Sequence, residues 1–162
     1  MARLVRVLCI VAYFLAAKAC VPPDCDNVDC GTCGNACCIL NVTIPLPPAK
    51  VYEAMVASFK EGGADKRYTF VGSYDMTSDK IAAKYTMESI HMTKVEHYND
   101  TQYFVIYENS METSTVRAFS ISQIYGAYCD YGQNYKNIVG YVKGLGVKYQ
   151  LAPVMGCPPK KD

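Results

Sequence analysis

Tryptophan is absent from this chain of 162 residues, histidine is scarce and no sign of charge dominates. His91 and His97 are the only histidines, and two ligands do not make a metal centre, so we expect no metal and no cofactor. The 16 basic and 15 acidic residues nearly cancel. Proteins that bind nucleic acid concentrate basic residues on one face, and this balance therefore predicts no nucleic-acid partner.

Motifs that would identify an enzyme are also missing. Ser120 and Ser122 lie outside the Gly-x-Ser-x-Gly context of a nucleophile elbow. The carboxylates lie mostly at the ends of expected strands, where solvated charges are common, and do not indicate a glycosidase-type pair. We therefore expect no catalytic residue.

Long apolar runs are limited to one, at residues 7–17. It follows a short basic start and precedes the small-x-small site Ala17-Lys18-Ala19, a pattern typical of a signal peptide and too short for a membrane span. We expect residues 1–19 to be removed and the mature chain to be secreted, extracellular and without a membrane span. The mature chain would keep 13 basic and 15 acidic residues.

Cysteine, in contrast, is abundant. Cys9 would leave with the signal peptide, and eight cysteines would remain: Cys20, Cys25, Cys30, Cys33, Cys37, Cys38, Cys129 and Cys157. An even number in a secreted chain predicts four disulfides, whose connectivity the spacing does not determine. The alternative is a zinc site at Cys30-x2-Cys33 and Cys37, which the oxidising secretory route disfavours.

Composition divides the mature chain into four parts. Residues 20–40 form a cysteine-rich segment with few other apolar side chains, which its disulfides must hold together. Residues 41–48 are proline-rich and predict an extended linker. Residues 48–157 carry the periodic patterns of a folded domain, and residues 158–162 form a polar tail. Asn41 and Asn99 begin N-glycosylation sequons.

The pattern of the main domain predicts the α+β class. Val51, Met55 and Phe59 recur at helical spacing, which predicts a helix over residues 48–60. Five segments of period two follow, at residues 67–74, 80–87, 90–98, 102–108 and 115–122, and their short connections predict an antiparallel meander. A last helix is expected over residues 134–145. The expected order is therefore helix, five-strand antiparallel meander, helix, with a disulfide-rich appendage at the N-terminus.

Tyrosine is unusually abundant in this chain, with 14 residues. Cross-strand aromatic packing is the simpler interpretation. The functional alternative is a concave sheet whose tyrosines line a cavity for a small apolar ligand, with their hydroxyls orienting it. The candidate residues on the expected strands are Tyr68, Tyr74, Tyr85, Tyr103 and Tyr107.

The stretch from Arg117 to Ile138 resembles the closing motif of the domain-of-unknown-function family 1499. The matching residues are Arg117, Ser120, Gly126, Asp130, Gly132, Asn134 and Ile138, whereas Ala118 and Asn137 depart from that family's pattern. The resemblance implies the helix–strands–helix fold and no activity. We expect Ser120, Asp130, Gly132, Asn134 and Ile138 to be structural, with Asp130 accepting hydrogen bonds at the helix start and Asn134 as its N-cap.

The chain is also similar to lipocalins at two places. Asp100-Thr101-Gln102-Tyr103 resembles their Thr-Asp-Tyr motif, and Arg117 resembles their late-strand arginine, which adds Arg117 to the ligand-binding candidates. The Gly-x-Trp start of lipocalins is missing, and five expected strands are fewer than the eight of their barrel.

Three functions remain open at this level. The first is a secreted, non-catalytic binding protein that holds a small apolar ligand between sheet and helices. The second is a structural or interaction module that contacts an extracellular protein through its cysteine-rich segment. The third is an enzyme, which a buried ionisable cluster around His91 or His97 would favour.

Overall fold

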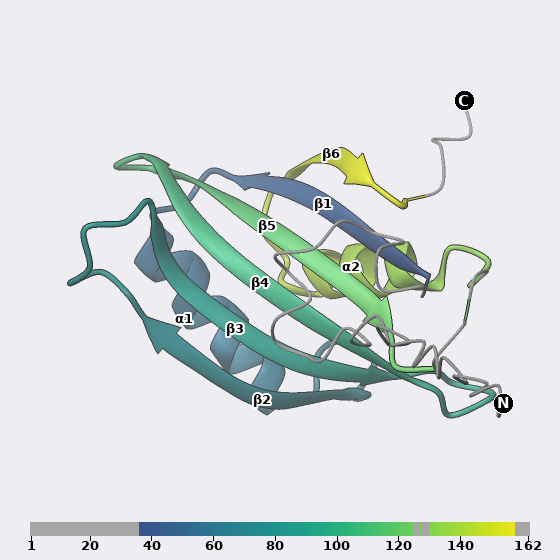
Figure 1. Cartoon of the computed structure of the whole chain (residues 1–162). Coiled ribbons are helices and arrows are strands. Elements are labelled where there is room, and N and C mark those ends of the chain that lie inside the picture. The colour runs from purple at the N-terminus through teal and green to yellow at the C-terminus, as the bar shows by residue number, and fades with distance from the viewer. Residues whose placement is uncertain (1–35, 125–126, 128–129, 158–162) are drawn as a thin grey trace, which may run out of the picture.

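The computed structural model describes residues 36–124, 127 and 130–157 of the chain. It contains one antiparallel sheet with both helices on the same face (Figure 1). The elements in chain order are β1 (Cys37–Ile44), α1 (Pro48–Lys60), β2 (Tyr68–Asp75), β3 (Ala83–Met92), β4 (Asn99–Ser110), β5 (Thr113–Ser122), α2 (Gln133–Gly144) and β6 (Gln150–Met155). The strands lie side by side in the order β2-β3-β4-β5-β1-β6, which confirms the α+β class.

The described sheet has six strands, and the prediction of five was wrong in two ways. First, the expected strands at 80–87 and 90–98 overlap one continuous strand, β3. Glu88 and Ser89 looked like a turn because they are polar. Ser89 is fully buried, and its hydroxyl donates to Gln102 Oε1 on β4 at 3.0 Å, so the strand passes through without a break.

Second, two strands lie where none was expected. The end of the cysteine-rich segment and the first half of the supposed linker form β1, which pairs with β5 on one side and β6 on the other. Cys38, Leu40, Val42 and Ile44 alternate toward the helices and are buried, as a central strand requires. Strand β6 is an exposed edge strand, so its sequence carries no apolar alternation.

Helix α1 begins and ends at the predicted residues, Pro48 and Lys60. Val51, Met55 and Phe59 are buried against the sheet. Phe59 stacks on Tyr141 of α2, with ring centroids 4.0 Å apart. Side chains therefore fill the space where the two helices meet.

Helix α2 covers the part of the sheet formed by β5 and β1. Ile138, Tyr141 and Val142 face inward and are buried. The Tyr141 hydroxyl donates to the Met55 carbonyl at 2.7 Å and so joins the two helices. Neither helix of the described residues is long and apolar enough to cross a membrane.

The face of the sheet away from the helices carries a second, smaller cluster. It contains Cys37, Ile39, Phe119 and Ile121, with Tyr103 packed against them. These residues alternate along their strands with the residues that face the helices.

A disulfide joins Cys38 on β1 to Cys157, just after β6. Cys37 is also disulfide-bonded. The bridge holds the end of the edge strand β6 against its neighbour β1. The other predicted disulfide cysteines, Cys20, Cys25, Cys30, Cys33 and Cys129, lie outside the described residues, as do residues 1–19 and 158–162.

Candidate functional site

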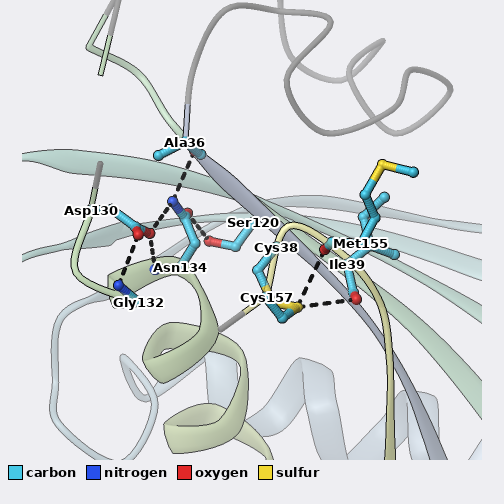
Figure 2. Close-up of a disulfide and its surroundings, with 9 residues drawn as sticks. All are labelled: Ala36, Cys38, Ile39, Ser120, Asp130, Gly132, Asn134, Met155 and Cys157. Carbon is cyan, nitrogen blue, oxygen red and sulfur yellow. Dashed lines mark hydrogen bonds between the residues drawn. A yellow bond between two sulfur atoms is a disulfide. The ribbon is translucent and has the colours of Figure 1, made fainter. Parts of the chain in front are cut away.

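The start of α2 is tied down by one carboxylate, that of Asp130 (Figure 2). Its Oδ1 accepts from the Gly132 amide at 2.9 Å, and its Oδ2 accepts from the Asn134 amide at 2.7 Å. These amides belong to the first turn, where backbone N–H groups have no partner within the helix. A negative charge here also meets the positive end of the helix dipole.

The expectation that Asn134 caps the helix was wrong, because the N-cap is Gly132 in a left-handed conformation at φ 74°. The Asn134 side chain instead turns into the protein. Its Oδ1 accepts from Ser120 Oγ on β5 at 2.6 Å, and its Nδ2 donates to the Ala36 carbonyl at 2.9 Å. Asn134 therefore links α2 to β5 and to the residue before β1 (Figure 2). Ile138 is fully buried in the core.

One end of the helix-facing side of the sheet is polar. The pairing register places Tyr68, His91, Asp100 and Ser122 in one row across β2, β3, β4 and β5. The next row contains Ser89, Gln102 and Ser120, all fully buried. The row after it is apolar, since it contains Met87, Phe104 and Ala118. The first half of α2 covers this polar end.

Asn137 of α2 forms hydrogen bonds with two members of this polar row, Asp100 and Tyr68. Its Nδ2 donates to Asp100 Oδ2 at 2.7 Å, its Oδ1 accepts from Gln133 Nε2 at 2.7 Å, and its carbonyl accepts from the Tyr68 hydroxyl at 2.6 Å. Asn137 and Asp100 are both buried. The pKa of Asp100 is raised to about 6, chiefly by burial and also by the nearby Asp130, against the lowering effect of the bonds from Asn137 and Ser122.

His91 is the second ionisable group in this row, and its side chain is only 3% exposed. Its Nε2 lies 3.0 Å from Asp65 Oδ2. Its Nδ1 is buried and has no hydrogen-bond partner in the described part of the chain. The ring also packs on Tyr68, with centroids 4.4 Å apart.

Asp65 and Arg67 precede β2 and form the rim of the site. The Asp65 carboxylate accepts from Arg67 Nε at 3.1 Å and from Arg67 Nη2 at 2.7 Å. Partial burial raises the pKa of Asp65, but its bonds with His91 and Arg67 outweigh this effect, and the net pKa lies below its ordinary value. Asp65 is therefore a carboxylate shared between an imidazole and a guanidinium.

These residues surround a cavity of about 280 Å³, which we call the α2 pocket. The segment before β2 and the adjoining strands contribute Ala64, Asp65, Arg67, Tyr68 and His91. Helix α2 contributes Gln133, Lys136, Asn137 and Gly140. A Cβ atom added at Gly140 would meet no other atom within 4 Å, so this side of the pocket is open.

The structure does not gather the predicted tyrosines around one cavity. Tyr68 lines the α2 pocket, whereas Tyr85 is buried in the core and stacks on Tyr52 at 4.4 Å. Tyr74 and Tyr103 line a hollow of about 210 Å³ with residues of β2 and β3. Tyr107 and Arg117 alternate with helix-facing residues of β4 and β5 and so belong to the opposite face.

The two sequons lie on strands. Asn99 is exposed at the start of β4. Asn41 lies in the middle of β1, between Arg117 of β5 and Ala152 of β6. Among the described residues no group of three or more potential ligands could hold a metal ion.

Sequence reasoning missed most of the α2 pocket. Gln133, Lys136, Asn137 and Gly140 recur at helical spacing and form a face of α2 without apolar side chains, beside its apolar stripe. That signal was available in the sequence. The meeting of Asp65 with His91 was not, because they come together only through the pairing register of β2 and β3.

Comparison of the chain with protein-family models, with curated proteins and with solved structures finds no match. The function is therefore argued from the site itself.

Proposed function

We propose that this protein is a secreted, disulfide-stapled binding protein that holds a small polar ligand in the α2 pocket. The proposal of secretion rests on the signal-peptide pattern of residues 1–19. The bridge between Cys38 and Cys157 fits an oxidising compartment.

The observation that carries the binding proposal is the state of His91. It lines the pocket, it is almost fully buried, and its Nδ1 has no partner in the described part of the chain. A buried polar atom without a hydrogen bond costs about 1–3 kcal/mol. Such exceptions are uncommon in folded proteins. A ligand with a polar group beside His91 would offset this cost.

Gly140 supports the same proposal. A glycine inside a helix costs about 1 kcal/mol relative to alanine. The packing of the described chain gives no reason for it, because a Cβ atom at this position would touch nothing. A ligand that lies against α2 would provide the reason.

The α2 pocket replaces the interface between sheet and helices as the proposed place of binding. That interface is occupied by Phe59, Phe104 and Tyr141, whose ring centroids lie 4.0 to 5.5 Å apart. The residues that line the α2 pocket are mostly charged or polar. The ligand is therefore proposed to be polar rather than wholly apolar.

An acid–base enzyme is the second candidate, and the cluster of Asp65, His91 and Asp100 favours it. A histidine held by a carboxylate is a common general base. None of the residues that line the pocket is a serine, threonine or cysteine, so covalent catalysis by such a nucleophile has no support there. Binding without turnover is the simpler use of this site.

A screen of small polar compounds by ligand-observed NMR tests the proposal. Wild-type protein is compared with Gly140→Leu, whose side chain would fill the open side of the pocket. We expect compounds that bind wild type and lose binding in Gly140→Leu, while both proteins melt cooperatively. Equal binding to the two proteins, or no binding compound at all, would contradict the proposal. Conversion of a bound compound to product would favour the enzyme.

A further inference from the structure

The hydrogen-bonding groups of the α2 pocket are not equally available. Gln133 donates one N–H to Asn137, and Asn137 donates one N–H to Asp100, so each amide keeps a second, uncharged N–H. The Tyr68 hydroxyl is engaged by the Asn137 carbonyl. His91 Nδ1 has no partner among the described residues, and the cationic donors on the pocket wall belong to Arg67 and Lys136. A pocket wall with two cationic donors favours a ligand that accepts hydrogen bonds and carries negative charge.

Arg67 is held in position for such a contact. Its Nε and Nη2 both donate to Asp65, and its side chain is only 27% exposed. Nη1 makes no hydrogen bond within the described part of the chain. The planar guanidinium therefore has a fixed orientation and keeps donors free, which suits the geometry of a carboxylate.

Lys136 provides the second cation from α2. Its Nζ donates to the Tyr131 carbonyl at 3.2 Å, and it forms no ion pair with a carboxylate of the described residues. The side chains of Arg67, Lys136 and Asp65 together carry a net charge of +1. Asp100 lies behind Asn137 and does not line the pocket. A ligand with one negative charge matches this wall better than a phosphate, which carries about −1.5 to −2 at neutral pH.

The rest of the wall sets the size and character of the ligand. The cavity of about 280 Å³ lies just below the range for drug-sized sites, roughly 300–1,000 Å³. Ala64 and Gly140 present small surfaces, and the buried ring of Tyr68 presents an apolar one. The space therefore fits a compact apolar body attached to the anionic group.

We infer that the α2 pocket binds a small organic monocarboxylate, whose carboxylate lies between Arg67 and Lys136 and whose apolar body lies against Tyr68 and Gly140. This inference deepens the proposed function and rests on it.

Isothermal titration of the full-length mature protein with four probes tests the inference. Benzoate and isobutyrate carry the carboxylate, benzamide is the neutral isostere, and inorganic phosphate is the competing anion. We expect benzoate or isobutyrate to bind at least tenfold more tightly than benzamide or phosphate. Tighter binding of phosphate, or equal binding of benzoate and benzamide, would overturn the inference.

Three variants locate the binding. Lys136→Gln should weaken carboxylate binding three- to tenfold, because it removes one of the two cations beside the carboxylate. Lys136 is exposed, so the fold does not depend on it. Lys143→Gln is the matched control, since Lys143 lies on the same helix outside the pocket, and it should leave binding unchanged. Gly140→Leu should abolish binding. Carboxylate binding that is indifferent to Lys136→Gln or to Gly140→Leu would overturn the inference.

The inference and the proposed function fail in different ways. If the carboxylates do not bind but other polar compounds bind wild type and not Gly140→Leu, the inference is wrong and the binding pocket stands. If no compound of either set depends on Gly140, both are wrong.

Discussion

Asn137 on α2 donates a hydrogen bond to Asp100 on β4 at 2.7 Å, and both side chains are buried. This contact closes the polar end of the sheet against the helix. The same asparagine contributes to the wall of the α2 pocket. Asn137 therefore contributes both to the packing of α2 on the sheet and to the wall of the pocket.

The first prediction concerns the charge on Asp100. Burial raises its pKa to about 6 in the folded protein, above the ordinary value of 3.8. The folded state therefore binds the proton more tightly than the unfolded state. This group stabilises the fold most below pH 4, and its contribution is lost as the pH rises through 6. The loss is roughly 2–3 kcal/mol.

Asp100→Asn should remove this dependence, because asparagine still accepts from Asn137 and never ionises. The free energy of unfolding of the variant, measured in urea from pH 4 to pH 7.5, should rise relative to wild type as the pH increases. Asp65 acts in the opposite direction and at lower pH, since its pKa is lowered. The exposed Asp79→Asn is the control, and a wild-type-like pH profile for Asp100→Asn would contradict the prediction.

The second prediction concerns Asp130 at the start of α2. Its carboxylate accepts from the amides of Gly132 and Asn134 and from the Asn134 side chain at 2.8 Å. Asp130→Ala should lower the free energy of unfolding by about 2 kcal/mol. Asp130→Asn, which keeps one accepting oxygen, should lose less. Chemical denaturation measures both, with Glu96→Ala as an exposed acidic control. An unchanged curve for Asp130→Ala would show that these bonds contribute nothing.

Local patterns predicted the elements whose side chains alternate clearly between core and solvent. Helix α1 has the predicted boundaries because Pro48 suits a first helical turn and Val51, Met55 and Phe59 mark one face. Strand β1 escaped prediction because its buried face begins at Cys38, and the cysteines suggested a loop held by disulfides. Strand β6 escaped because an exposed edge strand has no buried face to pattern its sequence.

The site follows the same division. Asp130 lies close to its partners in sequence, and its role at the helix start could be anticipated. His91 and Asp65 are 26 residues apart and meet through strand register. Register depends on the whole sheet, and the sequence pattern predicts two strands in the region where β3 is continuous. A pocket built from long-range pairing was therefore beyond the reach of local reasoning.

The third prediction concerns the bridge between Cys38 and Cys157, which closes a loop of 119 residues. A disulfide over such a separation stabilises by about 2–4 kcal/mol, chiefly by restricting the unfolded chain. The free energy of unfolding of the double variant Cys38→Ser/Cys157→Ser should be lower by that amount, so the variant should unfold at a lower urea concentration. Intact mass after alkylation without reductant should show no label on either cysteine in wild type. Labelling of Cys157 in native protein would contradict the bridge.

The fourth prediction compares two glycines of α2 that differ in their surroundings. A Cβ atom at Gly140 would meet nothing within 4 Å, whereas one at Gly144 would lie 2.6 Å from Ala64 Cβ. Gly140→Ala should therefore stabilise the protein by about 1 kcal/mol through helix propensity alone. Gly144→Ala should destabilise it, because the segment before β2 must move away from the helix.

The double variant Ala64→Gly/Gly144→Ala separates steric contact from other causes. Removing the Ala64 methyl group should recover stability lost in Gly144→Ala, whereas Ala64→Gly alone should not stabilise wild type. Thermal melts of the four proteins give this coupling directly. Because Ala64 and Gly140 both line the α2 pocket, Gly140→Ala should also narrow it while the fold gains stability. If Gly140→Ala is more stable but binds ligand less tightly, Gly140 favours ligand binding at the expense of helix stability. Unchanged or improved binding would leave the destabilising effect of Gly140 on the helix without a functional reason.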